Sequence, residues 1–210
     1  MNLDDYDVLI FDLDGLIIDS LDNLSSALQD SVRSFANASE FTHFRKYDLD
    51  NPGLSRFVKV NYFCKKIVKN RSVDQSEILR IFNQKSLEAR IKSTISSAIF
   101  KLYKKYNYKT WIILTNCDAT QIFQVLDYFN LTSLFFPNIF GTPPSKNLQA
   151  KKIVQNFSSK KSIIISDSES DGMIAKDVGT DFLFVEEFSR GNENWVLQNY
   201  YTVPNLSSLI

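Results

Sequence analysis

The sequence predicts an α/β protein built on a doubly wound parallel sheet, with a small helical domain inserted into it. Two observations predict this fold. Short apolar runs alternate with helical patterns over most of the chain, and one long stretch contains helical patterns only. A chain of 210 residues with 44% hydrophobic content is large enough to form one such core and an insertion.

Four short apolar runs, each followed by polar residues, predict the strands. They lie at 8–11, 111–114, 163–165 and 182–185. Continuous apolar runs of this length are typical of parallel strands that are buried on both faces. Between the last three runs, helical patterns occur at 118–129, 146–157 and 170–178. This alternation predicts a doubly wound sheet, whose ligands bind beyond the carboxyl ends of the strands.

Residues 21–92 interrupt the alternation and predict a separate helical domain. Amphipathic patterns occur there at 21–36, 54–69 and 75–90. A turn is expected at 51–53, and Ser72 or Asp74 is expected to cap the last helix. We therefore expect a core domain formed by 1–20 and 93–210, with 21–92 inserted.

Composition argues against several classes of partner. The 24 basic and 24 acidic residues cancel, so no overall field favours nucleic acid or an anionic membrane. The two cysteines, Cys64 and Cys117, lack metal-ligand spacing and fit a reduced compartment. The N-terminus lacks signal-peptide features, and no apolar run reaches membrane-spanning length. We expect a cytoplasmic protein.

Carboxylates follow two of the apolar runs, and a Thr-Asn pair follows a third. The four carboxylates belong to Asp12, Asp14, Asp167 and Asp171. If they meet at one edge of the sheet, they repel one another unless a hard cation lies among them. A set of oxygen donors without His or Cys suits Mg²⁺. The sequence therefore predicts a magnesium site at this edge.

Four short motifs resemble those of the haloacid dehalogenase superfamily, in the same order and over essentially the whole chain. They are Phe11-Asp12-Leu13-Asp14-Gly15 with Asp19-Ser20, then Thr115, then Lys146, and finally Asp167 with Asp171. The helical insertion between the first two motifs is similar to the cap of phosphoglycolate phosphatases and β-phosphoglucomutases. One residue departs from the pattern, because Ser166 stands where the family usually has Gly.

The resemblance implies a Rossmann-like core and a phosphoryl-transfer reaction. It implies that Asp12 attacks phosphorus to form an aspartyl-phosphate, and that Asp14 acts as general acid and base. It also implies that Asp12, the backbone carbonyl of Asp14, and Asp167 bind Mg²⁺. Asp14 excludes two subclasses, since dehalogenases of the family lack this second acid and transport ATPases carry Thr there.

The resemblance further implies a phosphate site. Its residues are Gly15, Thr115, Asn116 and Lys146. Lys146 is implied to offset the negative charge of the transition state. Asp171 is implied to orient Lys146 or to reach the metal through water. Ser168 is implied to help fix the loop that carries Asp167 and Asp171.

Two cations of the insertion, Arg56 and Lys59, are candidate substrate contacts. They lie three residues apart on one face of a predicted helix, so they could reach a phosphate or a sugar carboxylate. They could equally form the hydrated face of that helix. The segments 51–59 and 140–146 are similar to a branch found among surface-polysaccharide gene clusters, which suggests a sugar phosphate as substrate.

Three functions remain open. The first is a phosphatase that hydrolyses a small phosphorylated metabolite, such as a sugar phosphate. The second is a phosphomutase, in which the cap excludes water and a substrate hydroxyl accepts the phosphoryl group. The third is a catalytically weak member that binds a phosphorylated ligand and regulates a pathway. Because every catalytic position holds a competent residue, the sequence favours the first.

Overall fold

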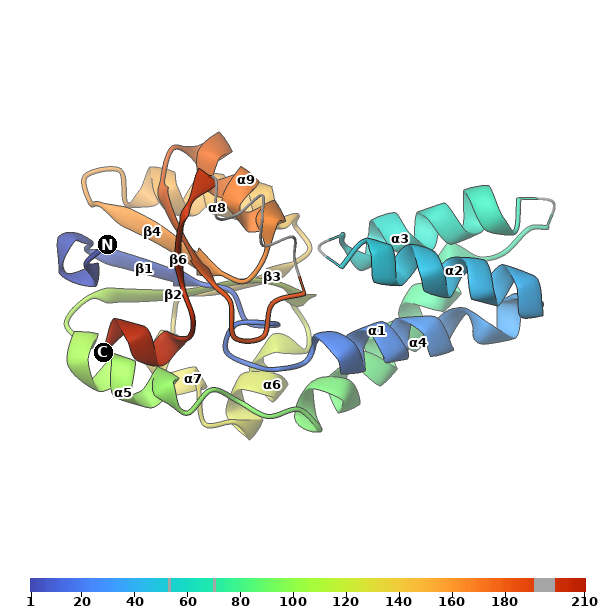
Figure 1. The fold of residues 1–210 in the computed structure, drawn as a ribbon, viewed down its shortest axis with the longest axis horizontal. Coiled ribbons are helices and arrows are strands. Elements are labelled where there is room, and N and C mark those ends of the chain that lie inside the picture. Colours follow the sequence, from blue (N-terminus) through green and yellow to red (C-terminus); the bar gives the residue numbers. More distant parts are fainter. Residues whose placement is uncertain (53, 70, 191–198) are drawn as a thin grey trace. The chain divides into compact units, whose positions relative to one another are not determined.

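The computed structural model describes residues 1–52, 54–69, 71–190 and 199–210, and the chain divides into two compact units. The core unit comprises Met1–Asp19 and Thr94–Ile210, and the helical unit comprises Ser20–Ser93. Both are drawn in Figure 1. Gly53, in the turn expected at 51–53, lies outside the described residues.

Within the described residues, the core unit contains a six-stranded parallel sheet in the order β3-β2-β1-β4-β5-β6. Its strands are β1 (Val8–Phe11), β2 (Thr110–Asp118), β3 (Ile139–Thr142), β4 (Ser162–Ser166), β5 (Asp181–Val185) and β6 (Tyr201–Val203). The doubly wound α/β fold is thus confirmed, and β3 and β6 add to the four expected strands. Phe11, the last residue of β1, pairs with Ile113 of β2 and Ile165 of β4. The first motif therefore begins at the carboxyl end of a central strand.

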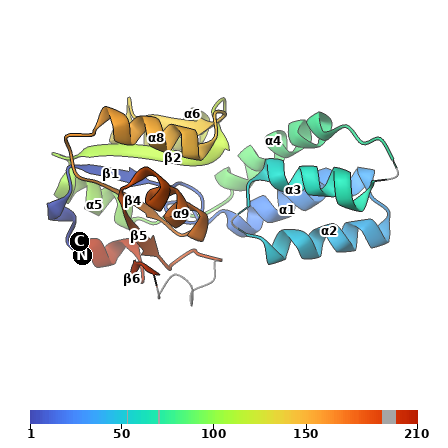
Figure 2. The same cartoon turned by 90° about the horizontal axis from the view of Figure 1, so that it is seen from above.

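Helices cover both faces of this sheet, as Figures 1 and 2 show. One face carries α8 (Lys146–Asn156) and α9 (Glu169–Val178), and the other carries α5 (Ala98–Tyr106), α6 (Ile122–Tyr128) and α7 (Thr132–Phe135). Two short 3-10 helices, η1 (Leu3–Asp5) and η4 (Leu206–Leu209), lie near the ends of the chain.

Side chains of β1 alternate between the two faces, because successive residues of a strand point in opposite directions. Ile10 belongs to the same buried cluster as Ile153 of α8. Phe11 stacks on Trp111 with ring centroids 4.6 Å apart, and meets Phe135 of α7 edge-on. The central strand is therefore buried on both sides, which fixes the position of the residues that follow it.

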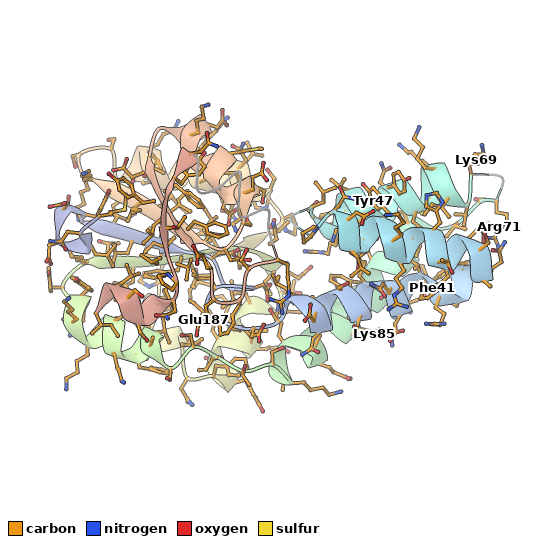
Figure 3. All side chains as sticks on the ribbon, viewed as in Figure 1. Phe41, Tyr47, Lys69, Arg71, Lys85 and Glu187 are labelled. Carbon is orange, nitrogen blue, oxygen red and sulfur yellow. The ribbon has the colours of Figure 1, made fainter. Side chains whose placement is uncertain are left out.

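The helical unit is held together by its own apolar core. Its elements are α1 (Leu21–Val32), η2 (Arg33–Phe35), α2 (Ala38–Asp50), α3 (Arg56–Tyr62), the π-helical turn η3 (Phe63–Ile67) and α4 (Gln75–Ile91). The fully buried Phe44 and Phe63 meet edge-on in this core. On α2 and α3, Tyr47 and Tyr62 stack with ring centroids 3.7 Å apart. Figure 3 labels Tyr47 in the helical unit.

Helix caps explain where two of these helices begin. Asp74 caps α4 by accepting a hydrogen bond from the Ser76 amide at 2.8 Å, as the sequence allowed. The helix α2 was not among the expected elements, and it begins with a capping box between Asn37 and Glu40. None of the described helices is long and apolar enough to cross a membrane.

Candidate active site

Asp12 is fixed directly beyond the carboxyl end of β1. Its backbone amide donates to the Ile165 carbonyl at 3.0 Å, which continues the pairing with β4. Its Oδ1 accepts a hydrogen bond from the Leu13 amide at 2.7 Å. The residue is only 8% exposed. The carboxylate is therefore held in one orientation, close to the edge of the sheet where ligands of such folds bind.

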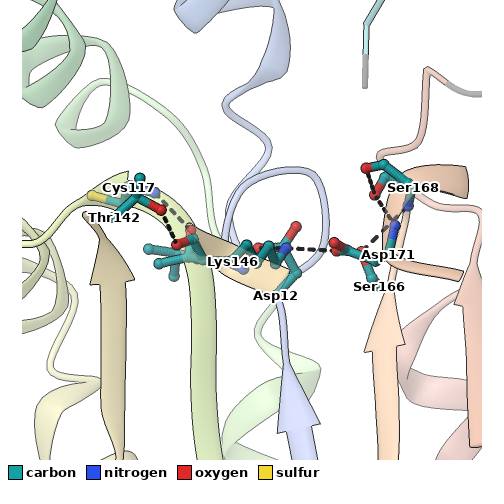
Figure 4. A network of polar contacts seen from close by, with 10 residues as sticks. Asp12, Cys117, Thr142, Lys146, Ser166, Ser168 and Asp171 are labelled. Atoms are coloured by element: carbon teal, nitrogen blue, oxygen red, sulfur yellow. Dashed lines mark hydrogen bonds and ion pairs between the residues drawn. The ribbon is translucent and has the colours of Figure 1, made fainter. Parts of the chain in front are cut away.

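Lys146 joins two of the predicted carboxylates. It is the first residue of α8, and its side chain is buried. Its Nζ lies 3.0 Å from Asp12 Oδ1 and 2.6 Å from Asp171 Oδ2 (Figure 4). Three residues that are far apart in the sequence thus form one buried ionic network.

Two serines hold Asp171, one at the end of β4 and one at the start of α9. The Ser166 hydroxyl donates to Asp171 Oδ2 at 2.5 Å. Ser168 caps α9, and its hydroxyl accepts a hydrogen bond from the Asp171 amide at 3.3 Å. Figure 4 shows both serines on the Asp171 side of the network.

Gly15 and Asp167 approach each other closely. The φ angle of Gly15 is +84°, and a Cβ atom at this position would lie 2.3 Å from Asp167 Oδ2. Only glycine fits this conformation and this space. Asp167 is buried, and among the described residues its Oδ1 has no hydrogen-bond partner. A buried carboxylate oxygen without a donor is well suited to a cation.

The electrostatics of the site reflect an excess of buried carboxylates. Burial raises the pKa of Asp12 to about 7; the nearby Lys146 lowers this pKa, while the charges of Asp171 and Asp14 raise it further. Burial also raises the pKa of Asp167 well above its usual range, and the charges of Asp12 and Asp171 add to the effect. Burial lowers the pKa of Lys146, but Asp12 and Asp171 outweigh this and raise it above its ordinary value. The site favours a bound proton or a cation.

The chemistry of these donors fits Mg²⁺. Asp12 and Asp167 offer carboxylate oxygens, which Mg²⁺ prefers, and their raised pKa values indicate that positive charge is lacking. No group of three or more His, Cys, Asp or Glu side chains in the described part of the chain is arranged to hold a metal ion. The implied ligand set does not require such a group, because it contains two carboxylate side chains and the carbonyl of Asp14.

Thr115 and Asn116 lie in β2, the neighbour of β1 in the sheet. Thr115 is buried, and its Oγ1 accepts a hydrogen bond from the Cys117 amide at 3.1 Å. A hydroxyl that accepts from the backbone still has its own hydrogen for an incoming oxygen atom. Asn116 and Asp14 are half-buried.

Arg56 and Lys59 belong to the helical unit, and the network around Lys146 belongs to the core unit. Both are buried, at 8% and 6% exposure, so they do not form a hydrated helix face. Lys59 Nζ lies 2.7 Å from Asp48 Oδ1. The other Asp48 carboxylate oxygen accepts hydrogen bonds from the Ser25 hydroxyl at 2.5 Å and from the side-chain amide of Gln29 at 2.9 Å. Substrate contact by either cation stays a prediction.

The structure shows contacts of three residues that could not be predicted from the sequence. Ser189, which follows β5, donates its hydroxyl to the Asp167 carbonyl at 2.7 Å. This hydrogen bond restrains the backbone of the loop that carries Asp167. Asp48 gives Lys59 a buried partner from a different helix. Ser166 was noticed only as a departure from a motif, and no periodicity or spacing indicated its bond to Asp171.

The parallel sheet and the carboxylate site at its carboxyl edge define an α/β enzyme. A family model of haloacid dehalogenase-like hydrolases matches residues 9–185, and the chain belongs to this family. The resemblance seen in the sequence is thereby confirmed. No curated protein matches the chain in sequence.

Solved structures share the whole fold at low sequence identity. A haloacid dehalogenase-like hydrolase from Streptococcus pneumoniae has a TM-score of 0.74 and 18% identity, covering 98% of this chain and 97% of that one. A predicted phosphoglycolate phosphatase from Haemophilus somnus has a TM-score of 0.73 and 14% identity, covering 98% and 96%. A magnesium-bound protein from Bacillus subtilis, described as a HAD-hydrolase, has a TM-score of 0.67 and 16% identity, covering 97% and 96%.

Proposed function

We propose that the protein is a magnesium-dependent phosphatase that hydrolyses a small phosphorylated metabolite, a sugar phosphate, through an aspartyl-phosphate on Asp12. The observation that carries this proposal is the buried contact of 3.0 Å between Asp12 Oδ1 and Lys146 Nζ, beside Asp167. This contact supports a role for Asp12 as nucleophile and for Lys146 as the positive charge next to it, and the buried carboxylate of Asp167 supports a bound cation.

In the first half of the reaction, the Asp12 carboxylate attacks phosphorus, and the bond from phosphorus to the leaving oxygen breaks. Asp14 gives its proton to that oxygen, so the substrate leaves as an alcohol. Thr115, Asn116 and Lys146 hold the phosphoryl oxygens and offset their charge. When bound by Asp12, Asp167 and the Asp14 carbonyl, Mg²⁺ would neutralise part of the charge that otherwise repels the substrate.

In the second half, Asp14 takes a proton from water, and the resulting hydroxide attacks the aspartyl-phosphate. The bond between phosphorus and Asp12 breaks, which releases inorganic phosphate and restores both aspartates. We assign the choice of leaving group to the helical unit, because its insertion between the first two motifs is similar to the family's caps.

The test is phosphate release from sugar phosphates, phosphoglycolate and nucleotides, with Mg²⁺ or with EDTA. We expect magnesium-dependent release that Asp12→Asn lowers by at least about a thousandfold. Asp177→Asn is the matched control, because Asp177 also lies 3.0 Å from a lysine of α8, Lys151, but on the surface. This control should keep the parent rate.

Other outcomes identify the other functions. Conversion of a sugar phosphate to its isomer without phosphate release would show a mutase. Ligand binding that survives Asp12→Asn, with no turnover by the parent, would show a regulatory protein. Either result would overturn the phosphatase proposal.

A further inference from the structure

Ser166 occupies a position at which its hydroxyl shares an acceptor with Lys146. It is the last residue of β4 and is completely buried. Its Oγ lies 2.5 Å from Asp171 Oδ2, and Lys146 Nζ lies 2.6 Å from the same oxygen. Figure 4 shows this arrangement next to Asp12. One carboxylate oxygen therefore receives two donors, of which only one is charged.

We propose that Ser166 is a positioning residue, which fixes Asp171 so that the Lys146 ammonium stays against Asp12. This inference rests on the proposed phosphatase function. A buried carboxylate needs donors for its charge, and hydrogen bonds to a charged group are stronger than those between neutral groups. Without the Ser166 hydroxyl, Lys146 would be the remaining donor to the Asp171 carboxylate among the described residues. The ammonium would be drawn toward Asp171, at the expense of its 3.0 Å contact with Asp12.

The direction of the Ser166 hydrogen is set by the loop. Ser166 Oγ accepts a hydrogen bond from the Ser168 amide at 3.3 Å, so its own hydrogen is left for Asp171. A continuous series of contacts then runs from the loop through Asp171 and Lys146 to Asp12. Asp167 lies between the two serines in sequence, so the same bond also restrains the proposed metal ligand.

A glycine, which the family usually has at this position, would provide no donor to Asp171. The departure in the motif is thus compensated by a specific contact, and the hydroxyl becomes part of the charge arrangement. The parent enzyme therefore depends on this hydroxyl through its contacts with Asp171 and the Ser168 amide.

The experiment is a double-mutant cycle of Ser166→Ala, Asp171→Asn and the double variant, with kcat, KM and the unfolding temperature measured for each protein. Ser31→Ala is the control, since Ser31 is also completely buried and donates its hydroxyl at 2.6 Å, but to the Ala27 carbonyl in the helical unit. Loss of a hydrogen bond to a charged group predicts a fall in kcat on the order of tenfold for Ser166→Ala. We expect KM to change by less than about twofold, since the positioned charge acts mainly in the transition state.

In the Asp171→Asn background, Ser166→Ala should lower kcat by less than about twofold, because the residue through which it acts has already been altered. Ser31→Ala should lower only the unfolding temperature. An unchanged kcat for Ser166→Ala, or the full loss in the Asp171→Asn background, would overturn the inference. If the parent releases no phosphate, the proposed function fails. The unfolding temperatures of the four proteins of the cycle then test whether Ser166 acts through Asp171. Non-additive changes support the link between Ser166 and Asp171, and additive changes overturn it.

Discussion

The close approach of Gly15 to Asp167 makes Gly15→Ala a sharp test of the site. The φ angle of +84° places any side chain in the left-handed region, which costs about 1 to 2 kcal/mol for a residue other than glycine. The new Cβ would lie 2.3, 2.6 and 2.9 Å from the three carboxyl atoms of Asp167. All three atoms belong to a side chain, so the cheapest response is rotation of the Asp167 side chain about its Cα–Cβ bond, at about 0.5 to 1.5 kcal/mol for an off-rotamer position.

Gly179→Ala is a matched control within the core unit. Gly179 ends α9 with a φ angle of +74°, and a Cβ there would meet no atom within 4 Å. It therefore has the backbone strain without the clash. For a chain of this size, about 1 kcal/mol corresponds to about 2 to 4 °C in unfolding temperature. We expect a loss of that order for Gly179→Ala and about twice that loss for Gly15→Ala.

The larger difference between the two variants should be functional, because Gly15→Ala turns Asp167 away from the position in which it would bind Mg²⁺. Thermal unfolding and isothermal titration with Mg²⁺ measure the two effects separately. We expect Gly179→Ala to bind Mg²⁺ and to release phosphate as the parent does, and Gly15→Ala to lose at least about tenfold in Mg²⁺ affinity. Parent-like affinity and turnover in Gly15→Ala would refute the assignment of Asp167.

Two further predictions concern buried charge. Lys59→Met leaves Asp48 buried without its cation and should lower the free energy of unfolding by about 3 kcal/mol or more. Lys46→Met removes an exposed pair with Asp50 and should cost about 0.5 kcal/mol or less; equal values in urea unfolding would contradict this contrast. Burial raises the folded-state pKa of Asp12 to about 7, above about 3.9 in an unfolded chain, so the metal-free protein should lose stability as pH rises from about 4 to 7. Asp12→Asn removes this pH-dependent loss. The free energy of unfolding of Asp12→Asn minus that of the parent, measured in EDTA, should therefore be larger at pH 8 than at pH 5. The same difference at both pH values would contradict the raised pKa of Asp12.

The sheet could be predicted where burial makes the sequence distinctive. The strands β1, β2, β4 and β5 are apolar runs because both of their faces are covered. Two strands lacked that signal. The strand β3, Ile139–Thr142, is half-exposed in its first two residues and contains Gly141, and β6, Tyr201–Val203, is a three-residue edge strand with no buried residue. The helix α2 was missed because only Phe44 and Asp48 are buried along it.

The site could be predicted only as far as motifs define it. The sequence identified Asp12, Lys146 and Asp171, and the structure brings these three into contact. It could not show that Lys59 pairs with Asp48, because that contact depends on how two helices pack. The spacing of Arg56 and Lys59 is equally compatible with an exposed and a buried face, and burial is decided by the neighbouring helices.

The distribution of buried charge explains why a cation is expected at this edge of the sheet. Among the described residues of the core unit, the buried charged groups are the carboxylates of Asp12, Asp167 and Asp171 and the ammonium of Lys146. Asp171 receives both Lys146 and Ser166, so its charge is well satisfied. Asp12 and Asp167 therefore lack compensating positive charge, and these are the buried carboxylates whose pKa values burial raises. Because a proton and a divalent cation compete for the same oxygens, the two carboxylates that hold protons most readily in the metal-free protein are also those that would bind Mg²⁺.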